Sequence, residues 1–516
     1  MRPCPAEVKA ALRWSRRPPC IVSRRGLMTL AIETSCDDTS VAVLETGVQK
    51  GLKVARLHFH KKVTSDNSAF QGVHPLVSLQ SHQENLASLV AQAIDHLPLS
   101  EWGHSVKDQP SEKGEMGTAA DIATRRIPDF ITVTRGPGMR SNLFTGLDTA
   151  KGLAVAWQKP LVGVHHMHAH ALTPRLVGAL EAYSPSYFPA DPLKNESGSS
   201  SLDFPFLSLL ASGGHTLLIH SASLTDHHVL GSTNDIAIGE CLDKAARAIL
   251  PAEILQATKS TMYGSLLETF AFAESQSKTQ EGKGSSWFSA LLPPTSVSRA
   301  NAHRFTAKEY LEKQGHDHSW YTVPSNYEEA TRRSTTTWGW GFNQPLTKSA
   351  GGAKINSFEM SFSGLMTAVE RVARYGMDPA TRKLNKAERA SDEISIEERK
   401  DLAREVMRAA FEHVASRVLL GLQSLSQIST AKPAVVMAGG VAANSFLRHI
   451  LASTLYAHGY EDVELHFPPP EYCTDNAAMI GWAGLEMFEA GHTDPLRIRA
   501  IRKWPLDQLL DPPSDG

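Results

Sequence analysis

The chain has 516 residues, of which 41% are hydrophobic and 21% are charged, a composition typical of a globular protein. This length predicts two or three lobes of ordinary size, and no apolar run approaches the roughly 20 residues that span a bilayer. The formal net charge of -2 excludes a strongly basic nucleic-acid binder, so any RNA contact must come from a local patch. Five cysteines without a CxxC pair or a regular spacing indicate neither a disulfide framework nor a thiolate zinc site.

The beginning of the chain differs in composition from the rest. Seven basic residues face a single acid, Glu7, within the first 25 residues. Arg-rich, acid-poor and potentially amphipathic segments are typical of mitochondrial transit peptides, and a disordered basic tail is the alternative. We therefore predict a transit peptide over residues 1–27 and a location in the mitochondrial matrix.

The first half of the chain alternates between predicted strands and helices. Two β-rich runs at 30–34 and 40–44 flank a polar turn and predict a hairpin. Apolar residues at helical spacing predict a helix over 78–96, and 100–126 is a loop or insertion. A strand at 131–134 ends in Arg135-Gly136-Pro137-Gly138, a small-residue helix follows at 141–156, and a further strand covers 161–164. This alternation predicts an α/β sheet.

A second strand-rich region follows a Ser-, Pro- and Asp-rich insertion at 184–204. Runs at 206–210 and 216–219 flank Ser212-Gly213-Gly214-His215 and predict another hairpin, whereas 275–356 has no interpretable pattern. Helical periodicity returns over 395–425, a buried strand is predicted at 435–438, and a small-residue helix begins near Asp475. Two halves that each open with a sheet and a glycine turn fit a duplicated α/β architecture.

Four histidines lie within six residues directly after the strand at 161–164. On a helix, His166 and His170 are four residues apart and face the same way, a spacing that can place both imidazoles on one metal ion. The segment lacks the glutamate of an HExxH peptidase. Since two histidines do not complete a site, an oxygen ligand must come from elsewhere.

Three glycine turns each follow a predicted strand. Without a Cβ atom, the backbone N–H groups of Ser212-Gly213-Gly214, Gly439-Gly440 and Gly136-Pro137-Gly138 can approach phosphate oxygens closely. One such turn is weak evidence, but three in one α/β chain favour a nucleotide site. No GxxxxGK[ST] or GxGxxG motif is present, which disfavours a P-loop or a Rossmann fold.

The segment Cys473-Thr474-Asp475-Asn476 precedes the last predicted helix. Thr474 or Asp475 can cap that helix. Alternatively, Asp475 supplies the missing oxygen ligand and Thr474 supplies a hydroxyl group for a phosphate.

At these residues the chain resembles the tRNA threonylcarbamoyladenosine synthase family, in its bacterial and mitochondrial branch once labelled O-sialoglycoprotein endopeptidases. The matching motifs run in family order from about Met28 to Gly484 and are together highly specific. They are Ile32-Glu33-Thr34-Ser35-Cys36-Asp37-Asp38-Thr39, Thr134 to Gly138, His166 to His170, Ser212 to Thr216, Asp243 to Arg247, Ser361 to Leu365, Gly439 to Asn444 and Cys473 to Ala478.

The resemblance implies two similar α/β lobes of the actin, sugar-kinase and heat-shock ATPase type, with a nucleotide cleft between them. We accordingly expect an N-terminal lobe over 28–165, a C-terminal lobe over 166–484 with an insertion near 275–356, and a tail over 485–516. It also implies a homodimer and one divalent metal ion per subunit, such as zinc or iron, held by His166, His170 and Asp475.

The reaction implied is transfer of a threonylcarbamoyl group from threonylcarbamoyl-AMP, made by a separate synthase, to N6 of an adenosine of tRNA. The implied contacts to the adenylate are Leu210, Ala211, Ser212, Gly213, Gly214, Asp243, Gly264, Glu268, Asn444 and Thr474. Gly264 and Glu268 are the best fit where the family often has Tyr-Pro-Gly-Gly and this chain has Met262-Tyr263-Gly264-Ser265. His168 likewise stands where relatives commonly have Glu.

Asp37 and Asp38 lie at the first predicted hairpin turn. We hypothesise that one of them moves the proton in catalysis, and an Asx pair that stabilises the turn is the alternative. Candidate basic surface for tRNA is Arg125, Arg126, Arg140 and the region from Arg371 to Arg408. The rival functions are a metallopeptidase, a sugar kinase of the same fold group and a non-catalytic scaffold.

Overall fold

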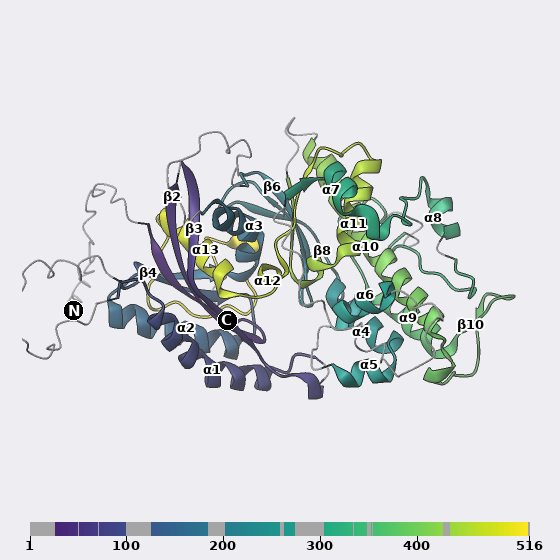
Figure 1. Ribbon diagram of the computed structural model, residues 1–516, viewed down its shortest axis with the longest axis horizontal. Coiled ribbons are helices and arrows are strands. Elements are labelled where there is room, and N and C mark those ends of the chain that lie inside the picture. Colours follow the sequence, from purple (N-terminus) through teal and green to yellow (C-terminus); the bar gives the residue numbers. More distant parts are fainter. Residues whose placement is uncertain are drawn as a thin grey trace, which may run out of the picture.

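The structure is a computed structural model that describes most of the chain (Figure 1). Residues 1–25 are outside it, so the predicted transit peptide is not tested, and the predicted insertions are described only in part. The described residues are 26–49, 51–70, 72–99, 125–183, 202–258, 263–273, 304–333, 335–347, 352, 354–426 and 434–513. No helix among them is long and apolar enough to cross a bilayer.

The first sheet has five strands in the order β3-β2-β1-β4-β5. The predicted hairpin is confirmed, because β1 pairs with β2 in antiparallel fashion, whereas β4 and β5 continue the sheet in parallel. All six residues of β1 are buried, since both faces of the sheet are covered. The strands are β1 (Met28–Glu33), β2 (Asp38–Gln49), β3 (Leu52–Thr64), β4 (Phe130–Gly136) and β5 (Leu161–His165).

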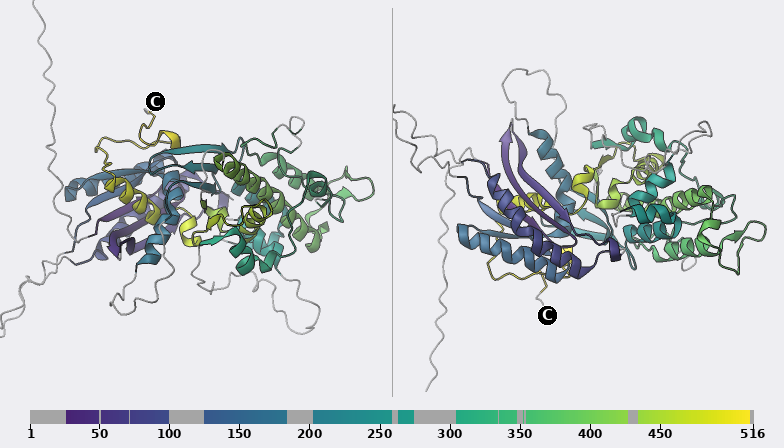
Figure 2. Two further views of the ribbon diagram at one scale, coloured as in Figure 1. Left: turned by 90° about the horizontal axis from the view of Figure 1, so that it is seen from above. Right: turned by 60° about the horizontal axis from the view of Figure 1, so that its bottom comes forward.

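Alternate residues of β1 pack against different helices, as the period of a strand requires. Leu30 and Ile32 face α1 (Pro75–Asp95) and α2 (Arg140–Trp157), which lie side by side beneath the sheet (Figures 1 and 2). Ala31 faces the opposite layer, formed by α3 (His166–Ala182) and α13 (Ala477–Glu489). The helices predicted at 78–96 and 141–156 are therefore confirmed.

The second sheet repeats the topology of the first. Its order is β8-β7-β6-β12-β13-β9, in which β6 and β7 form the predicted hairpin and β12 and β13 continue in parallel to β6. Two similar α/β lobes, the arrangement implied by the resemblance, are thus confirmed. The strands are β6 (Phe206–Ala211), β7 (Thr216–Ser221), β8 (His227–Ser232), β12 (Ala434–Ala438), β13 (Glu464–His466) and β9 (Arg304–Thr306).

Helices cover the second sheet and extend the C-terminal lobe. The central one is α10, whose predicted range of 395–425 agrees with the observed Ile396–Ser426. Around it lie α4 (Ile238–Ile249), α6 (Tyr263–Phe272), α9 (Ser363–Tyr375) and α11 (Ser445–Ala457). Shorter helices are α5 (Ala252–Ala257), α7 (Ala307–Gln314), α8 (Tyr327–Arg333) and α12 (Pro470–Cys473), and a small hairpin pairs β10 (Met377–Asp378) with β11 (Lys383–Leu384).

Helix α3 joins the two lobes. It contacts β3 and β5 of the first sheet and β6 and β12 of the second, and it packs along α13. The expected division of the lobes between residues 165 and 166 stays a prediction. Helices α3 and α13 both cover the first sheet, although they fall in the range assigned to the C-terminal lobe. The first turn of α3, which carries the histidines, therefore lies where the lobes meet.

Candidate metal centre and adjoining glycine turns

The predicted ligands converge where α3 and α13 begin. His165 accepts hydrogen bonds from the backbone N–H groups of Met167 and His168, and this cap starts α3 directly at the end of β5. Asn476 caps α13 in the same way. The alternative that Thr474 or Asp475 caps this helix is therefore wrong. The ligand atoms of His166, His170 and Asp475 all lie within 4.8 Å of one another.

Glu33 fixes the orientation of one imidazole. Oε2 of this wholly buried residue of β1 lies 3.2 Å from Nδ1 of His166. The other ring nitrogen of His166, Nε2, is therefore left to face Oδ1 of Asp475, 3.3 Å away. A carboxylate behind a histidine is the usual support of a metal ligand. Nε2 of His170 lies 3.1 Å from the same oxygen. The sequence placed Glu33 in a motif but assigned it no role, because only the fold shows that it faces His166.

The electrostatics of this group favour a cation. Burial raises the pKa of Asp37, and the charge of Asp475 raises it further. Burial lowers the pKa of His166, but the carboxylates of Asp475 and Glu33 outweigh this effect and raise it to about 10. Two imidazoles and a carboxylate, held by a buried second carboxylate, therefore fit a divalent ion with open coordination positions.

Lys62 was not identified from the sequence and connects two predicted site residues. Its Nζ atom donates to Oδ2 of Asp38 at 3.0 Å and to Oγ1 of Thr474 at 2.9 Å. Burial raises the pKa of Asp38 to about 6, although Lys62 acts in the opposite direction. Because Lys62 supplies the proton of this contact, the hydroxyl group of Thr474 is free to donate its own proton to an anion.

The glycine turns of the second lobe continue from Thr474. Gly440 lies 3.8 Å, measured from an ideal Cβ position, from Cγ2 of Thr474. A Cβ atom on Gly439 would lie only 2.4 Å from the carbonyl oxygen of Ala211, the last residue of β6. On the other side of this loop, Gly239 of α4 donates its N–H to the carbonyl oxygen of Ser212 at 3.1 Å. The segment from Leu210 to Gly214 is therefore held between α4 and the turn at Gly439.

The remaining residues predicted to contact the adenylate are linked to one another by hydrogen bonds that begin next to this loop. Asp243, one helical turn after Gly239, accepts from the N–H of Gly264 at 2.7 Å. Glu268 of α6 accepts from the N–H of Ser445 at 2.7 Å and from its hydroxyl group at 2.6 Å, and the neighbouring Asn444 caps α11. The fold thus brings all the predicted site residues into one connected set, while their roles stay predictions.

The third glycine turn lies on the first lobe. The N–H of Met139, which follows Gly138, donates to the carbonyl oxygen of Ser35 at 2.9 Å, and Oγ of Ser35 lies 3.3 Å from Nδ1 of His166. This turn therefore packs behind the histidine group.

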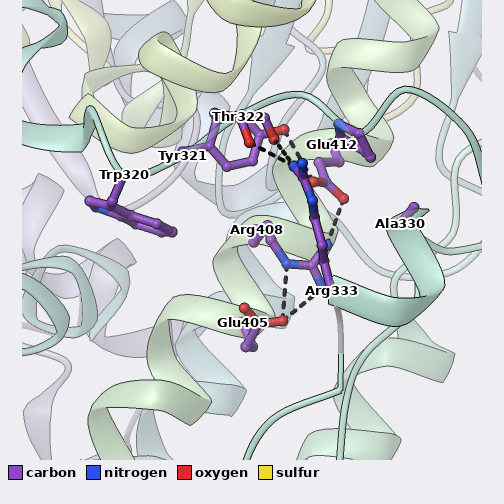
Figure 3. A pocket seen from close by; sticks show the side chains of 9 residues that line it. Trp320, Tyr321, Thr322, Ala330, Arg333, Glu405, Arg408 and Glu412 are labelled. Atoms are coloured by element: carbon purple, nitrogen blue, oxygen red, sulfur yellow. Dashed lines mark hydrogen bonds and ion pairs between the residues drawn. The ribbon is translucent and has the colours of Figure 1, made fainter.

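A separate cavity of about 200 Å³ lies in the helical part of the C-terminal lobe (Figure 3). Arg408 crosses it and lies 2.7 Å from both Glu405 and Glu412, and Glu412 also accepts from the hydroxyl group of Tyr321. Arg333 also lines the cavity and pairs with Glu329, so the charges of this cavity are paired, and none of the predicted site residues lines it. We assign it no ligand.

Comparison with known proteins identifies matches over most of the chain. The family model described as "TsaD: tRNA N6-adenosine threonylcarbamoyltransferase" matches residues 116–190, 193–292 and 322–482. The mitochondrial tRNA N6-adenosine threonylcarbamoyltransferase of Schizosaccharomyces pombe is 32% identical over 95% of this chain and 89% of its own length. A tRNA N6-adenosine threonylcarbamoyltransferase of Cereibacter sphaeroides is 30% identical over 94% of this chain and 95% of its own.

Solved structures give more distant matches. Full-length HypF in its phosphate- and nucleotide-bound form aligns with 91% of this chain and 57% of its own, with a TM-score of 0.37 and 12% sequence identity. We draw no argument from a match at this level.

Proposed function

The chain belongs to the tRNA N6-adenosine threonylcarbamoyltransferase family and is a transferase, and from this premise we propose its finer function. It transfers the threonylcarbamoyl group of threonylcarbamoyl-AMP to N6 of the adenosine next to the anticodon. Its substrates are mitochondrial tRNAs that read codons starting with adenine. The observation that carries the proposal is the convergence of His166, His170 and Asp475 beside a connected set of glycine turns and acids.

The adenylate binds along the loop from Leu210 to Gly214. No described atom lies within 4 Å of an ideal Cβ position on Gly213 or Gly214, and both residues are exposed, so a phosphate group can approach their backbone. Thr474 donates its free hydroxyl proton to the same group, and Asp243 accepts from a hydroxyl group of the nucleotide. Together these contacts fix the activated carbonyl carbon for attack.

The adenine amine is a poor nucleophile, so the site must manage both charge and a proton. A divalent ion held by His166, His170 and Asp475 would polarise the phosphate or carbamoyl oxygens of the adenylate. Asp37 or Asp38 takes the proton from N6 as the new C–N bond forms and AMP leaves. The raised pKa of Asp38, about 6, suits a base that works near neutral pH.

Location and assembly complete the proposal. The Arg-rich leader and the mitochondrial relative support residence in the mitochondrial matrix. We retain the homodimer and the separate synthase that supplies threonylcarbamoyl-AMP as inferences from the family.

The proposal is tested by incubating the purified chain with threonylcarbamoyl-AMP and two mitochondrial tRNA transcripts. One transcript reads codons starting with adenine and the other does not. We expect N6-threonylcarbamoyladenosine in the first alone, as measured by mass spectrometry of the digested nucleosides. Equal modification of both transcripts would contradict the proposed specificity, and cleavage of a glycoprotein without modification of tRNA would favour the metallopeptidase.

Asp243 provides a test that joins stability to substrate binding. Burial raises its pKa to about 6, although the N–H of Gly264 acts in the opposite direction. A pKa raised on folding means that the protonated carboxyl stabilises the fold at low pH and that this contribution is lost as pH rises from about 4 through about 6. At pH 8 the buried carboxylate therefore costs up to about 3 kcal/mol.

We expect Asp243→Asn to increase the free energy of unfolding by about 1–2 kcal/mol at pH 8 and to change it little at pH 4. The same variant loses affinity for the adenylate, because an anionic acceptor is removed. Denaturant titrations at both pH values and a direct binding assay measure these effects. The matched control is Glu312→Gln, an exposed carboxylate on α7 that should change neither quantity. A stability change that is equal at both pH values would exclude the buried charge as its cause.

A further inference from the structure

The chain after α13 returns to the junction of the lobes as an extended strap. We define the basic strap as residues 494–509. Asp494 pairs with Leu161 of β5, the N–H of Ile501 donates to the carbonyl oxygen of Arg135 at 2.8 Å, and the last turn contacts β8 of the second lobe. The strap therefore crosses from one lobe to the other.

Apolar side chains hold the strap in place. Six of its residues are buried, and the carbonyl oxygen of Ile501 approaches so closely that a Cβ atom on Gly136 would lie 2.1 Å from it. Ile501 and Trp504 pack with Leu210 of β6 and Ala438 of β12. The strap is thus part of the packed core. Its buried residues are Ile498, Ala500, Ile501, Trp504, Leu506 and Leu509.

Between Pro495 and Leu506, the outer side of the strap carries charge of one sign. Arg497, Arg499, Arg502 and Lys503 are exposed, and no acidic residue lies between Pro495 and Leu506. None of the four has an ion-pair partner in the part of the chain that the structure describes. Arg140 is exposed as well. It follows Gly138 by two residues, and the N–H of Gly138 donates to the carbonyl oxygen of Arg502 in the strap. This concentration stands out in a chain whose formal net charge is -2.

Two other basic residues that the sequence offered for a tRNA surface are engaged elsewhere. Arg126 contacts the carboxylates of both Glu45 and Asp129, and Arg408 is largely buried between Glu405 and Glu412. These two residues were wrong candidates for a tRNA surface, because their charges already neutralise neighbouring acids. The four cations of the strap have no such function within the fold.

The strap also adjoins the candidate metal centre. The carbonyl oxygen of Trp504 lies 2.9 Å from Nε2 of His165, the residue that precedes the ligand His166. The strap runs along β5, and its residues Ile501 and Trp504 pack at the carboxyl ends of β4, β5, β6 and β12, the edge where ligands of α/β sheets bind. An anion held along the strap would therefore lie next to the site of transfer.

We propose that the basic strap binds the phosphate backbone of the RNA substrate and so presents the adenosine to the metal centre. The inference rests on the proposed function for the identity of that RNA. Four cations spread over an extended segment of at most about 20 Å match a row of phosphates better than the phosphate of one nucleotide. Backbone contacts of this kind position a nucleic acid without reading its sequence.

The test compares two variants that lose equal charge. The first changes the strap (Arg497→Gln, Arg499→Gln, Arg502→Gln and Lys503→Gln). The control changes four exposed cations of the rival basic surface, the region from Arg371 to Arg408, near the β10–β11 hairpin at the far end of the C-terminal lobe in Figure 1 (Arg371→Gln, Arg382→Gln, Lys383→Gln and Lys386→Gln). Because all eight side chains are exposed, both proteins should unfold at the same temperature as the wild type.

The measured quantities are the Kd for an unmodified tRNA transcript at several salt concentrations and the Kd for the adenylate. For the strap variant we expect tRNA binding at least about tenfold weaker and a log–log salt slope reduced by about 3. Its adenylate affinity should be unchanged, and the control should behave as the wild type. The KM for tRNA should rise in the strap variant, with kcat near the wild-type value.

The two proposals fail in different ways. If the wild type modifies tRNA and the strap variant binds tRNA with unchanged affinity and slope, the strap inference is overturned and the proposed function stands. Weakening in the control alone would overturn it too and place the RNA on the β10–β11 side. If the wild type never modifies tRNA but only the strap variant loses RNA binding, the proposed function fails and the strap inference is supported.

Discussion

Replacing His166 or His170 with alanine is expected to abolish threonylcarbamoyl transfer to tRNA, with a loss of at least about a thousandfold in kcat/KM. Each substitution removes one of three groups that meet within 4.8 Å and leaves too few ligands to hold a divalent ion. Bound metal per subunit, measured by elemental analysis, should fall in parallel with the yield of modified nucleoside.

A matched control separates loss of a ligand from loss of any histidine. His228 lies on β8, its side chain is 61% exposed, and it is outside the ligand group, so His228→Ala should retain metal and activity. Since His166 and His170 are buried, thermal unfolding of each variant must show that it still folds. A folded His170→Ala variant that retains full activity would remove the metal from the mechanism.

Gly439→Ala is expected to have the next largest effect, because this residue sets the spacing between two of the turns. Its φ angle is +92°, a conformation that L side chains rarely adopt, and the new Cβ atom would lie 2.4 Å from the carbonyl oxygen of Ala211. The loop from Ala211 to Gly214 must move away. We expect a loss of roughly 2 kcal/mol in the free energy of unfolding and adenylate binding weakened at least about tenfold.

The neighbouring glycine is the control for this prediction. A Cβ atom on Gly440 would meet only Cγ2 of Thr474, at an ordinary contact distance of 3.8 Å. Gly440→Ala should therefore change stability and adenylate affinity by much less. Denaturant unfolding and equilibrium binding on both variants give the comparison, and equal effects at the two positions would show that the close approach to Ala211 does not shape the binding loop.

Local sequence pattern predicted much of the fold. The hairpins at 30–44 and 206–219 follow from β-rich runs on either side of a turn, and the helix at 141–156 follows from its small residues. The helices at 78–96 and 395–425 follow from apolar residues at helical spacing. The strand β3 was not predicted from the sequence. It is an edge strand with polar, exposed positions such as Lys61, so it lacks a regular apolar pattern. The segment that forms β9 and α7 was also missed, because β9 pairs with β13, about 160 residues away.

The site was predictable only where chemistry and local spacing coincide. His166 and His170 could be paired from their spacing on a helix. Asp475 lies 305 residues beyond His170, and the residues alone left it as either a ligand or a helix cap, so the family resemblance assigned it as a ligand. The roles of Glu33 and Lys62 depend on contacts across strands and between distant segments, which no local pattern encodes. The basic strap was predicted only as part of a C-terminal tail, because its position between the lobes depends on tertiary packing.

The central claim is that one site, built from His166, His170, Asp475 and the glycine turns, moves a threonylcarbamoyl group from an adenylate to tRNA. It is tested most directly with threonylcarbamoyl-AMP labelled in its threonine carbon, purified wild-type chain and an unmodified tRNA transcript. The predicted result is label in N6-threonylcarbamoyladenosine for the wild type and none for His170→Ala. Recovery of the label only as free threonine, with unmodified tRNA, would contradict the account.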